Sequence, residues 1–185
     1  MSLEIFETSI ADCKLFKPAV FEDERGYFYE GFNKAKLRDE LGIDFNIVQI
    51  NQSKSQKNVL RGLHFQIPPF EQAKLVSVIE GEVIDVAVDL RAGSPTYGKY
   101  EKVVLSSDNK LHFYIPKGFA HGFLVLSDSV KFMYGVDEEY SPAHDSGLKF
   151  DDPELSINWG VNSSNFIISE KDKNLGFFEA FSTPF

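Results

Sequence analysis

The sequence predicts a mainly β protein, a sandwich or barrel of short strands with few helices. The first observation behind this prediction is a clear strand pattern over Val83–Leu90, where every second residue is aliphatic. The second is a series of short apolar segments separated by turn-forming Ser, Asn, Asp, Gly and Pro residues. Their ranges are Lys102–Leu105, Lys110–Ile115, Gly122–Leu126 and Val130–Tyr134. Strands at such short intervals, with little helical pattern between them, are typical of all-β domains.

One segment near the N-terminus, residues 33–41, has the pattern of a helix. Asn33 is a suitable N-cap, and Gly42 is a suitable residue to end the helix. Leu37 and Leu41 are four residues apart, so both would face the core. The sequence therefore predicts one short helix before the strands begin.

The strand over Val83–Leu90 has two distinct faces. Ile84, Val86, Val88 and Leu90 fall on one face, whereas Val83, Asp85, Ala87 and Asp89 fall on the other. Turn residues bracket the strand at 80–82 and 91–95. Near the C-terminus, Phe166–Ser169 and Leu175–Phe181 fit either a short helix or a loop.

Composition narrows the classes of protein. The chain has 185 residues, which fits one domain over 1–185, and 43 % of them are hydrophobic. Its net charge of −9 argues against general nucleic-acid binding, although a few convergent cations could still hold a small anion. No segment is apolar enough for a membrane helix or a secretory signal, and the single Cys13 cannot form an internal disulfide. We therefore expect a cytoplasmic protein that binds neither nucleic acid nor membranes.

Two histidines lie in unusual settings. His121 ends a Pro116-Lys-Gly118-Phe-Ala-His segment, which resembles the Pro-x-Gly-x-x-His turn of the cupin superfamily, a double-stranded β-helix barrel of the jelly-roll type. Metal-binding cupins carry a His-x-His pair on an earlier strand, but here that position has His64-Phe65-Gln66. Zinc or iron needs three or more nearby ligands, so we expect no metal. Of the other histidines, His112 and His144 are expected to be hydrogen-bonded structural residues.

Eight motifs, two of which contain His64 and His121, occur in order within residues 5–175. They are Arg25-Gly-Tyr-Phe-Tyr-Glu30, Val48–Ser53, Arg61-Gly-Leu-His64, Lys74-Leu-Val76, Gly81–Arg91, Ser94-Pro-Thr96, Ile115–Phe123 and Ser169-Glu-Lys-Asp172. Together they resemble the dTDP-4-dehydrorhamnose 3,5-epimerase family. The resemblance implies a mainly β cupin-type barrel with a few short helices. It also implies an isomerase that inverts C3 and C5 of a dTDP-linked 4-keto-6-deoxyhexose, in rhamnose synthesis for a surface glycan.

The resemblance implies a role for four catalytic residues. His64 would be the base that removes a proton beside the C4 ketone, and Asp172 would orient and charge its ring. Tyr134 would return the proton from the opposite face of the sugar. Lys74 would stabilise the negative oxygen of the enolate. This chemistry needs no metal or redox cofactor, so we expect none.

The resemblance also implies a substrate-binding set, partly shared across a homodimer. Arg25, Arg61 and Lys171 would bind the diphosphate and nearby groups, because cations form strong charge-assisted hydrogen bonds with phosphate. The remaining members would contact the thymine, the sugar or their surroundings. They are Phe28, Glu30, Gln49, Asn51, His121, Tyr140 and Asp145.

Three alternatives remain open at this stage. The chain departs from the family at Gly135-Val-Asp137, at Asp145 where Glu is frequent, and at Phe150 where Trp is frequent. These changes could reshape the sugar pocket, so a mono-epimerase acting at C3 or C5 alone is the first alternative. The second is a non-catalytic cupin that binds a sugar nucleotide. The third is a metal-dependent cupin oxygenase, which the missing His-x-His pair disfavours.

Overall fold

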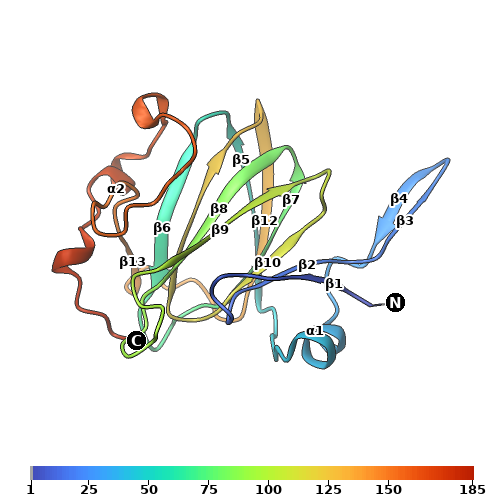
Figure 1. Cartoon of the computed structure of the whole chain (residues 1–185), viewed down its shortest axis with the longest axis horizontal. Coiled ribbons are helices and arrows are strands. Elements are labelled where there is room, and N and C mark those ends of the chain that lie inside the picture. The colour runs from blue at the N-terminus through green and yellow to red at the C-terminus, as the bar shows by residue number, and fades with distance from the viewer. Residues whose placement is uncertain (1) are drawn as a thin grey trace.

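Two antiparallel β-sheets pack face to face in the computed structural model, which describes residues 2–185 (Figure 1). The six-stranded sheet has the order β1 (Glu4–Phe6), β2 (Lys14–Lys17), β10 (His112–Ile115), β7 (Lys74–Glu80), β12 (Ser129–Val136) and β5 (Gln49–Gln56). The five-stranded sheet has the order β13 (Asp145–Gly147), β6 (Leu60–Gln66), β11 (Phe119–Val125), β8 (Glu82–Asp89) and β9 (Tyr100–Ser106). This arrangement confirms the predicted mainly β fold.

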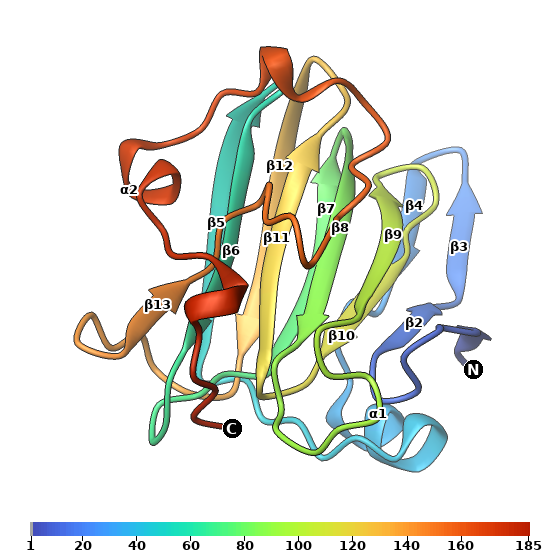
Figure 2. The ribbon, with the colours of Figure 1, turned by 60° about the vertical axis from the view of Figure 1, so that its left-hand side comes forward.

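A hairpin and a few short helices complete the chain. The hairpin of β3 (Val20–Asp23) and β4 (Gly26–Tyr29) projects away from the sandwich (Figure 1). The C-terminal segment contains η1 (Ser163–Asn165), α2 (Glu170–Lys173) and η2 (Phe178–Ala180), and it crosses the outer face of the five-stranded sheet (Figure 2). No helix within residues 2–185 has the length and apolarity that a bilayer crossing requires.

The helix α1 (Lys34–Leu41) forms where the sequence predicts it. The Asn33 side chain accepts a hydrogen bond from the Lys36 amide, and Gly42 ends the helix with a left-handed φ of 72°. Leu37 is buried, and the less buried Leu41 packs against the same apolar cluster. This cluster joins α1 to the outer face of the six-stranded sheet, so the helix covers part of that face.

Apolar side chains fill the space between the sheets and cover one outer face. The inter-sheet cluster includes Val76, Val78, Val83, Leu105, Phe113, Phe123 and Phe132. A second cluster lies on the outer face of the five-stranded sheet, under the C-terminal segment. Its members include Ile84, Val86, Val88, Leu124, Trp159 and Phe178. Most of β8 is therefore buried on both faces, which explains why its sequence is apolar almost throughout.

The strand predictions are confirmed with small shifts of their ends. Val83–Leu90 corresponds to β8, and the four later segments correspond to β9, β10, β11 and β12. Of the two ambiguous C-terminal segments, 166–169 is extended and Ile167 forms an isolated bridge with Val59. The other segment, 175–181, contains the short η2 helix.

Candidate active site

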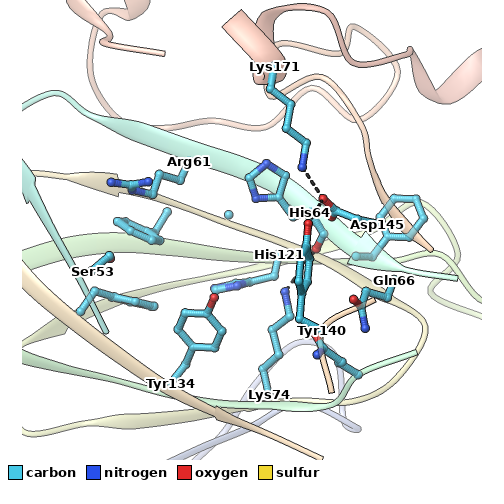
Figure 3. A pocket seen from close by; sticks show the side chains of 15 residues that line it. Ser53, Arg61, His64, Gln66, Lys74, His121, Tyr134, Tyr140, Asp145 and Lys171 are labelled. Carbon is cyan, nitrogen blue, oxygen red and sulfur yellow. Dashed lines mark hydrogen bonds and ion pairs between the residues drawn. The ribbon is translucent and has the colours of Figure 1, made fainter. Parts of the chain in front are cut away.

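A cavity of about 270 Å³ opens between the two sheets at the end where β13 and the C-terminal segment lie (Figure 3). Side chains from both sheets and from α2 line it. They include Ser53, Arg61, His64, Gln66, Gln72, Lys74, His121, Tyr134, Tyr140, Asp145 and Lys171. The structure thus gathers eight of the fourteen predicted site residues around one cavity, and Asp172 lies directly behind His64.

His64 is paired with the carboxylate predicted for it. Its Nε2 lies 2.8 Å from Asp172 Oδ1, although the two residues are 108 positions apart in the chain. The other carboxylate oxygen, Asp172 Oδ2, accepts a hydrogen bond from the Gly62 amide at 3.2 Å. Burial tends to raise the pKa of Asp172, but the hydrogen bonds from His64, Gly62 and Ser169 outweigh this effect and hold the pKa below its usual value. The carboxylate is therefore ionised and can orient the imidazole ring.

Local sequence explains how Asp172 reaches His64. Ser169 caps α2, since its Oγ accepts a hydrogen bond from the Asp172 amide at 3.0 Å. Gly62 has a φ of 124°, and a Cβ there would lie 2.6 Å from the Cα of Gly122. Glycine at both positions lets β6 and β11 approach closely, at the point where their register shifts. The Gly62 amide can then point toward the carboxylate.

A second histidine–carboxylate pair lies beside the first. His121 Nε2 is 3.0 Å from both oxygens of Asp85, whose side chain is completely buried. Burial lowers the pKa of His121, although the carboxylate of Asp85 acts in the opposite direction. The sequence pattern puts Asp85 on one face of its strand and indicates no role for it. Its signal was a carboxylate within an otherwise apolar strand, a position that is stable only with a partner.

Lys74 and Tyr134 face the cavity from the opposite wall, on β7 and β12 of the six-stranded sheet. Lys74 is only 8 % exposed, and burial lowers its pKa to about 8 while Asp85 and Asp145 offset part of that shift. The hydroxyl group of Tyr134 points into the cavity (Figure 3). Burial raises the pKa of Tyr134, so the hydroxyl keeps its proton at neutral pH. One wall thus carries the two histidines, and the other carries a cation and a proton donor.

Three predicted binding residues meet at the rim. Tyr140 Oη donates a hydrogen bond to Asp145 Oδ2 at 3.0 Å, and the Lys171 ammonium forms an ion pair with the same oxygen (Figure 3). This contact with Asp145 raises the pKa of Lys171 and of Tyr140. The rim therefore joins the loop after β12, strand β13 and α2 through one carboxylate.

The opposite side of the cavity carries Arg61, whose Nε donates a hydrogen bond to Ser55 Oγ at 3.1 Å. Ser53 lies nearby, and its buried hydroxyl group has no hydrogen-bond partner within residues 2–185. Buried polar groups are normally paired, so this hydroxyl is available to a bound molecule. Ser53 ends one of the family-like motifs, and nothing else in the sequence marks it as a site residue.

The remaining predicted residues lie outside the cavity lining. Gln49 and Asn51 lie on β5, where their side chains are hydrogen-bonded to each other at 2.8 Å. Arg25 and Phe28 lie on the projecting β3–β4 hairpin, and Phe28 is 69 % exposed. Glu30 follows the hairpin and binds Asn33 and Lys36 near α1. None of these five residues lines the cavity.

The other two histidines have structural surroundings. His112 is buried and stacks on Phe16, and burial lowers its pKa to about 4. His144 packs on Phe70 and bonds Ser141 Oγ at 2.7 Å. Across the part of the chain that the structure describes, no group of three or more His, Cys, Asp or Glu residues is placed to hold a metal ion.

The fold and the cavity define a cupin-type protein whose pocket gathers acid–base side chains on two facing walls. Three relatives narrow this class. The dTDP-4-dehydrorhamnose 3,5-epimerase of Methanothermobacter thermautotrophicus is 50 % identical over 91 % of this chain and 90 % of its own length. The dTDP-6-deoxy-D-glucose-3,5-epimerase of Legionella pneumophila, solved with dTDP-4-keto-L-rhamnose, has a TM-score of 0.93 and 44 % identity over 97 % of this chain and 95 % of its own. ChmJ, a 3'-monoepimerase from Streptomyces bikiniensis solved with dTDP-quinovose, has a TM-score of 0.83 and 32 % identity over 89 % of this chain and 83 % of its own.

The sequence profile of the dTDP-4-dehydrorhamnose 3,5-epimerase family matches residues 7–180. The chain therefore belongs to this family. Family membership confirms the fold and the isomerase class predicted from the sequence motifs, together with the epimerase activity on a dTDP-linked keto sugar.

Proposed function

We propose that the chain inverts C3 and C5 of dTDP-4-dehydro-6-deoxy-D-glucose and produces dTDP-4-dehydro-L-rhamnose. The observation that carries this proposal is the placement of His64, with Asp172 behind it, opposite Tyr134 and Lys74 in one cavity. Epimerisation needs a base on one face of the sugar and a proton donor on the other. The two sheets supply these groups from two facing walls.

We assign the steps to four side chains. His64 removes the proton from the carbon beside the C4 ketone, and the electron pair moves onto the ketone oxygen to form an enolate. Asp172 stabilises the resulting imidazolium. The Lys74 ammonium stabilises the enolate oxygen. Tyr134 then donates its phenolic proton to the opposite face of the same carbon, and the ketone re-forms.

The binding residues divide between the two ends of the ligand. Lys171 and Arg61 offer cations at the cavity mouth, where a diphosphate would lie. His121, Tyr140 and Asp145 line the cavity close to Lys74. His121 is suited to the sugar and its phosphate, whereas the Asp145 carboxylate can accept hydrogen bonds from sugar hydroxyl groups but would repel a phosphate. Gln49 and Asn51 extend the site along β5 toward the nucleoside.

We also propose that the protein is a homodimer in which the β3–β4 hairpin of one subunit enters the site of its partner. Arg25 and Phe28 lie on this hairpin, away from the cavity of their own subunit. Phe21 and Tyr27 are also exposed there, and Val48 and Ile50 are exposed around β5. A partner that covers these apolar side chains would bring Arg25, Phe28 and Glu30 to the nucleotide end of the site.

Three further predictions belong with this proposal. A single epimerase domain over residues 1–185 is supported by the C-terminal segment, because it packs on the same sheet that carries His64 and supplies Asp172. The cytoplasmic location stays a prediction, as does turnover without a metal or cofactor.

The test is proton–deuterium exchange in D2O with dTDP-4-dehydro-6-deoxy-D-glucose, followed by NMR. We expect deuterium at C3 and C5 and inversion at both carbons. The lower identity to the 3'-monoepimerase than to the 3,5-epimerases supports this outcome. Exchange and inversion at one carbon alone would instead identify a mono-epimerase, and no exchange at either would identify a non-catalytic binding protein.

A further inference from the structure

Gln66 occupies the position where metal-binding cupins carry their second histidine, and the proposed reaction gives it no role. It lies at the end of β6 and is only 4 % exposed. Its side chain nevertheless makes three hydrogen bonds. Nε2 donates to the carbonyl oxygens of Phe70 at 2.7 Å and Glu139 at 3.1 Å, and Oε1 accepts from the Ser141 amide at 2.7 Å. The amide group therefore binds the backbone on both sides of Tyr140.

Two other glutamines bind the same stretch of backbone. Gln72 Nε2 donates to the Glu138 carbonyl at 2.7 Å, and Gln49 Oε1 accepts from the Tyr140 amide at 3.0 Å. Four backbone groups in consecutive residues 138–141 are thus held by side-chain amides. An irregular loop cannot pair its backbone groups within a sheet, so such groups need other partners. Glutamine suits this task because one side chain carries both donors and an acceptor.

The arrangement fixes Tyr140 at both ends. Its backbone is held by Gln49 and lies between the two groups bound by Gln66, while its hydroxyl group donates to Asp145. Gln66 is two residues from His64 on β6, and alternate residues of a strand point to the same side. The strand that carries the proposed base therefore also sets the position of the loop that carries Tyr140 (Figure 3).

We propose that Gln49, Gln66 and Gln72 form a glutamine clamp, which is a set of positioning residues. The clamp holds Tyr140 at the rim of the cavity, in a fixed position relative to His64. The clamp acts on substrate binding through Tyr140 and not on proton transfer. Its functional effect rests on the proposed function, whereas its effect on the loop can be measured without substrate.

The first measurement is amide hydrogen exchange of Tyr140 and Ser141 by NMR in the free protein. Gln66→Met keeps the length of the side chain but removes its hydrogen bonds, so exchange at Ser141 should accelerate by roughly 10-fold or more. Gln66→Glu keeps an acceptor for the Ser141 amide but places its second oxygen against the Phe70 and Glu139 carbonyl groups, so exchange at Ser141 should accelerate less than in Gln66→Met. Gln56→Met is the matched control, because Gln56 is an exposed glutamine of β5 with no side-chain hydrogen bond to residues 2–185.

The second measurement separates binding from chemistry. For Gln66→Met we expect KM and the Kd for dTDP to rise by roughly 10-fold, while kcat changes by less than about 3-fold. Because Gln66 also lines the cavity, a double-mutant cycle with Tyr140→Ala is needed. If Gln66 acts through Tyr140, then Gln66→Met should add little to the Kd for dTDP in the Tyr140→Ala background.

The clamp would be overturned if Gln66→Met left Ser141 exchange unchanged, or if the two substitutions raised Kd independently. A fall in kcat with unchanged KM would also contradict it. If Gln66→Met fails to fold, Gln49→Met at the sheet edge tests the clamp instead. Exchange of the Tyr140 amide should accelerate in that variant, because Gln49 no longer accepts its hydrogen bond. If the wild-type protein shows no turnover, the proposed function fails, and the exchange data still test the clamp.

Discussion

His64 and His121 lie side by side on the neighbouring strands β6 and β11, and each ring is bound to a different carboxylate. Their environments differ in exposure. The side chain of His64 is 32 % exposed beside Asp172, whereas that of His121 is 7 % exposed beside the fully buried Asp85. A base must reach its substrate and release its proton again. The exposure difference therefore favours His64 as the base and His121 as a buried contact residue.

We predict that His64→Asn abolishes both solvent exchange and inversion. Without a base no enolate forms, so the loss should be at least the ~10²–10⁴-fold that is typical of general-base removal. Deuterium incorporation into the sugar, followed by NMR, measures exchange directly. His144→Asn is the control, because it removes a histidine outside the cavity and should keep exchange. Substantial exchange in His64→Asn would assign the base to another residue.

Tyr134→Phe should separate proton removal from proton return. The phenylalanine ring keeps the packing against Phe132 but lacks the hydroxyl group. His64 can still remove a proton and return a deuteron to the same face, so exchange should outrun inversion at the same carbon. The ratio of the two rates, measured by NMR in D2O, is the readout. Inversion at the wild-type rate would show that water or another group is the donor.

The sequence pattern predicted the scaffold better than the site, and β5 shows why. Its inward positions carry Gln49, Asn51 and Ser53, whereas Ile50 between them is exposed. Hydrophobic periodicity expects the reverse, because it assumes that buried positions are apolar. The inward positions of β5 are polar, so the periodicity did not predict this strand. The family motifs, and not the periodicity, indicated Gln49 and Asn51 as candidate binding residues.

The sequence pattern also could not predict which distant residues contact each other. Asp172 and His64 are 108 positions apart, and only the family resemblance suggested that they meet. Asp85 and Gln66 were visible as polar residues in apolar strands, which signals a paired group but does not name the partner. The partners, His121 and the loop at 138–141, follow from strand order and register, and these depend on the assembled sheet.

Asp172→Asn should impair catalysis and change acid stability. An amide cannot stabilise the imidazolium, so we expect a loss on the order of 10⁴-fold, as for a triad aspartate. The pKa of Asp172 lies below its usual value in the folded state, so its stabilising effect is complete above the unfolded pKa of about 3.8 and is lost as the pH falls through the folded value. Denaturant unfolding should show that the variant has a lower free energy of unfolding than wild type, with a larger deficit at pH 7 than at pH 2. An equal deficit at both pH values would contradict this linkage.

The proposed homodimer predicts that the hairpin and the active site depend on each other. Light scattering at micromolar concentration should give twice the mass of one chain, with an interface of roughly 2,000 Å² or more. Phe28→Asp places a charge on the exposed hairpin and should weaken both dimerisation and dTDP binding. Glu22→Gln, on the same hairpin, is the control. A monomeric Phe28→Asp protein with wild-type KM would rule out a shared site.

Titration of Lys74 should affect activity and stability in opposite directions as the pH rises. Burial lowers its pKa to about 8, so raising the pH above 8 removes the positive charge that would stabilise the enolate. Activity should therefore fall through a limb near pH 8. Tyr134 does not account for this limb, because burial raises its pKa above the ordinary value of about 10. Lys74→Arg keeps a charge at this pH, so the limb should disappear even if kcat is lower.

Stability should change in the other direction over the same range. Between pH 8 and about 10.5 the unfolded chain still holds the Lys74 proton, whereas the folded protein has released it. The unfolded state then binds more protons, so the contribution of Lys74 to the free energy of unfolding rises with pH. Lys74→Met should be more stable than wild type at pH 7, with the difference shrinking toward pH 10, and should lose ~10²–10³-fold in kcat. Denaturant unfolding and the pH–rate profile measure the two effects separately. If wild-type activity and stability fell together above pH 8, unfolding would explain the limb and Lys74 would lose its assigned role.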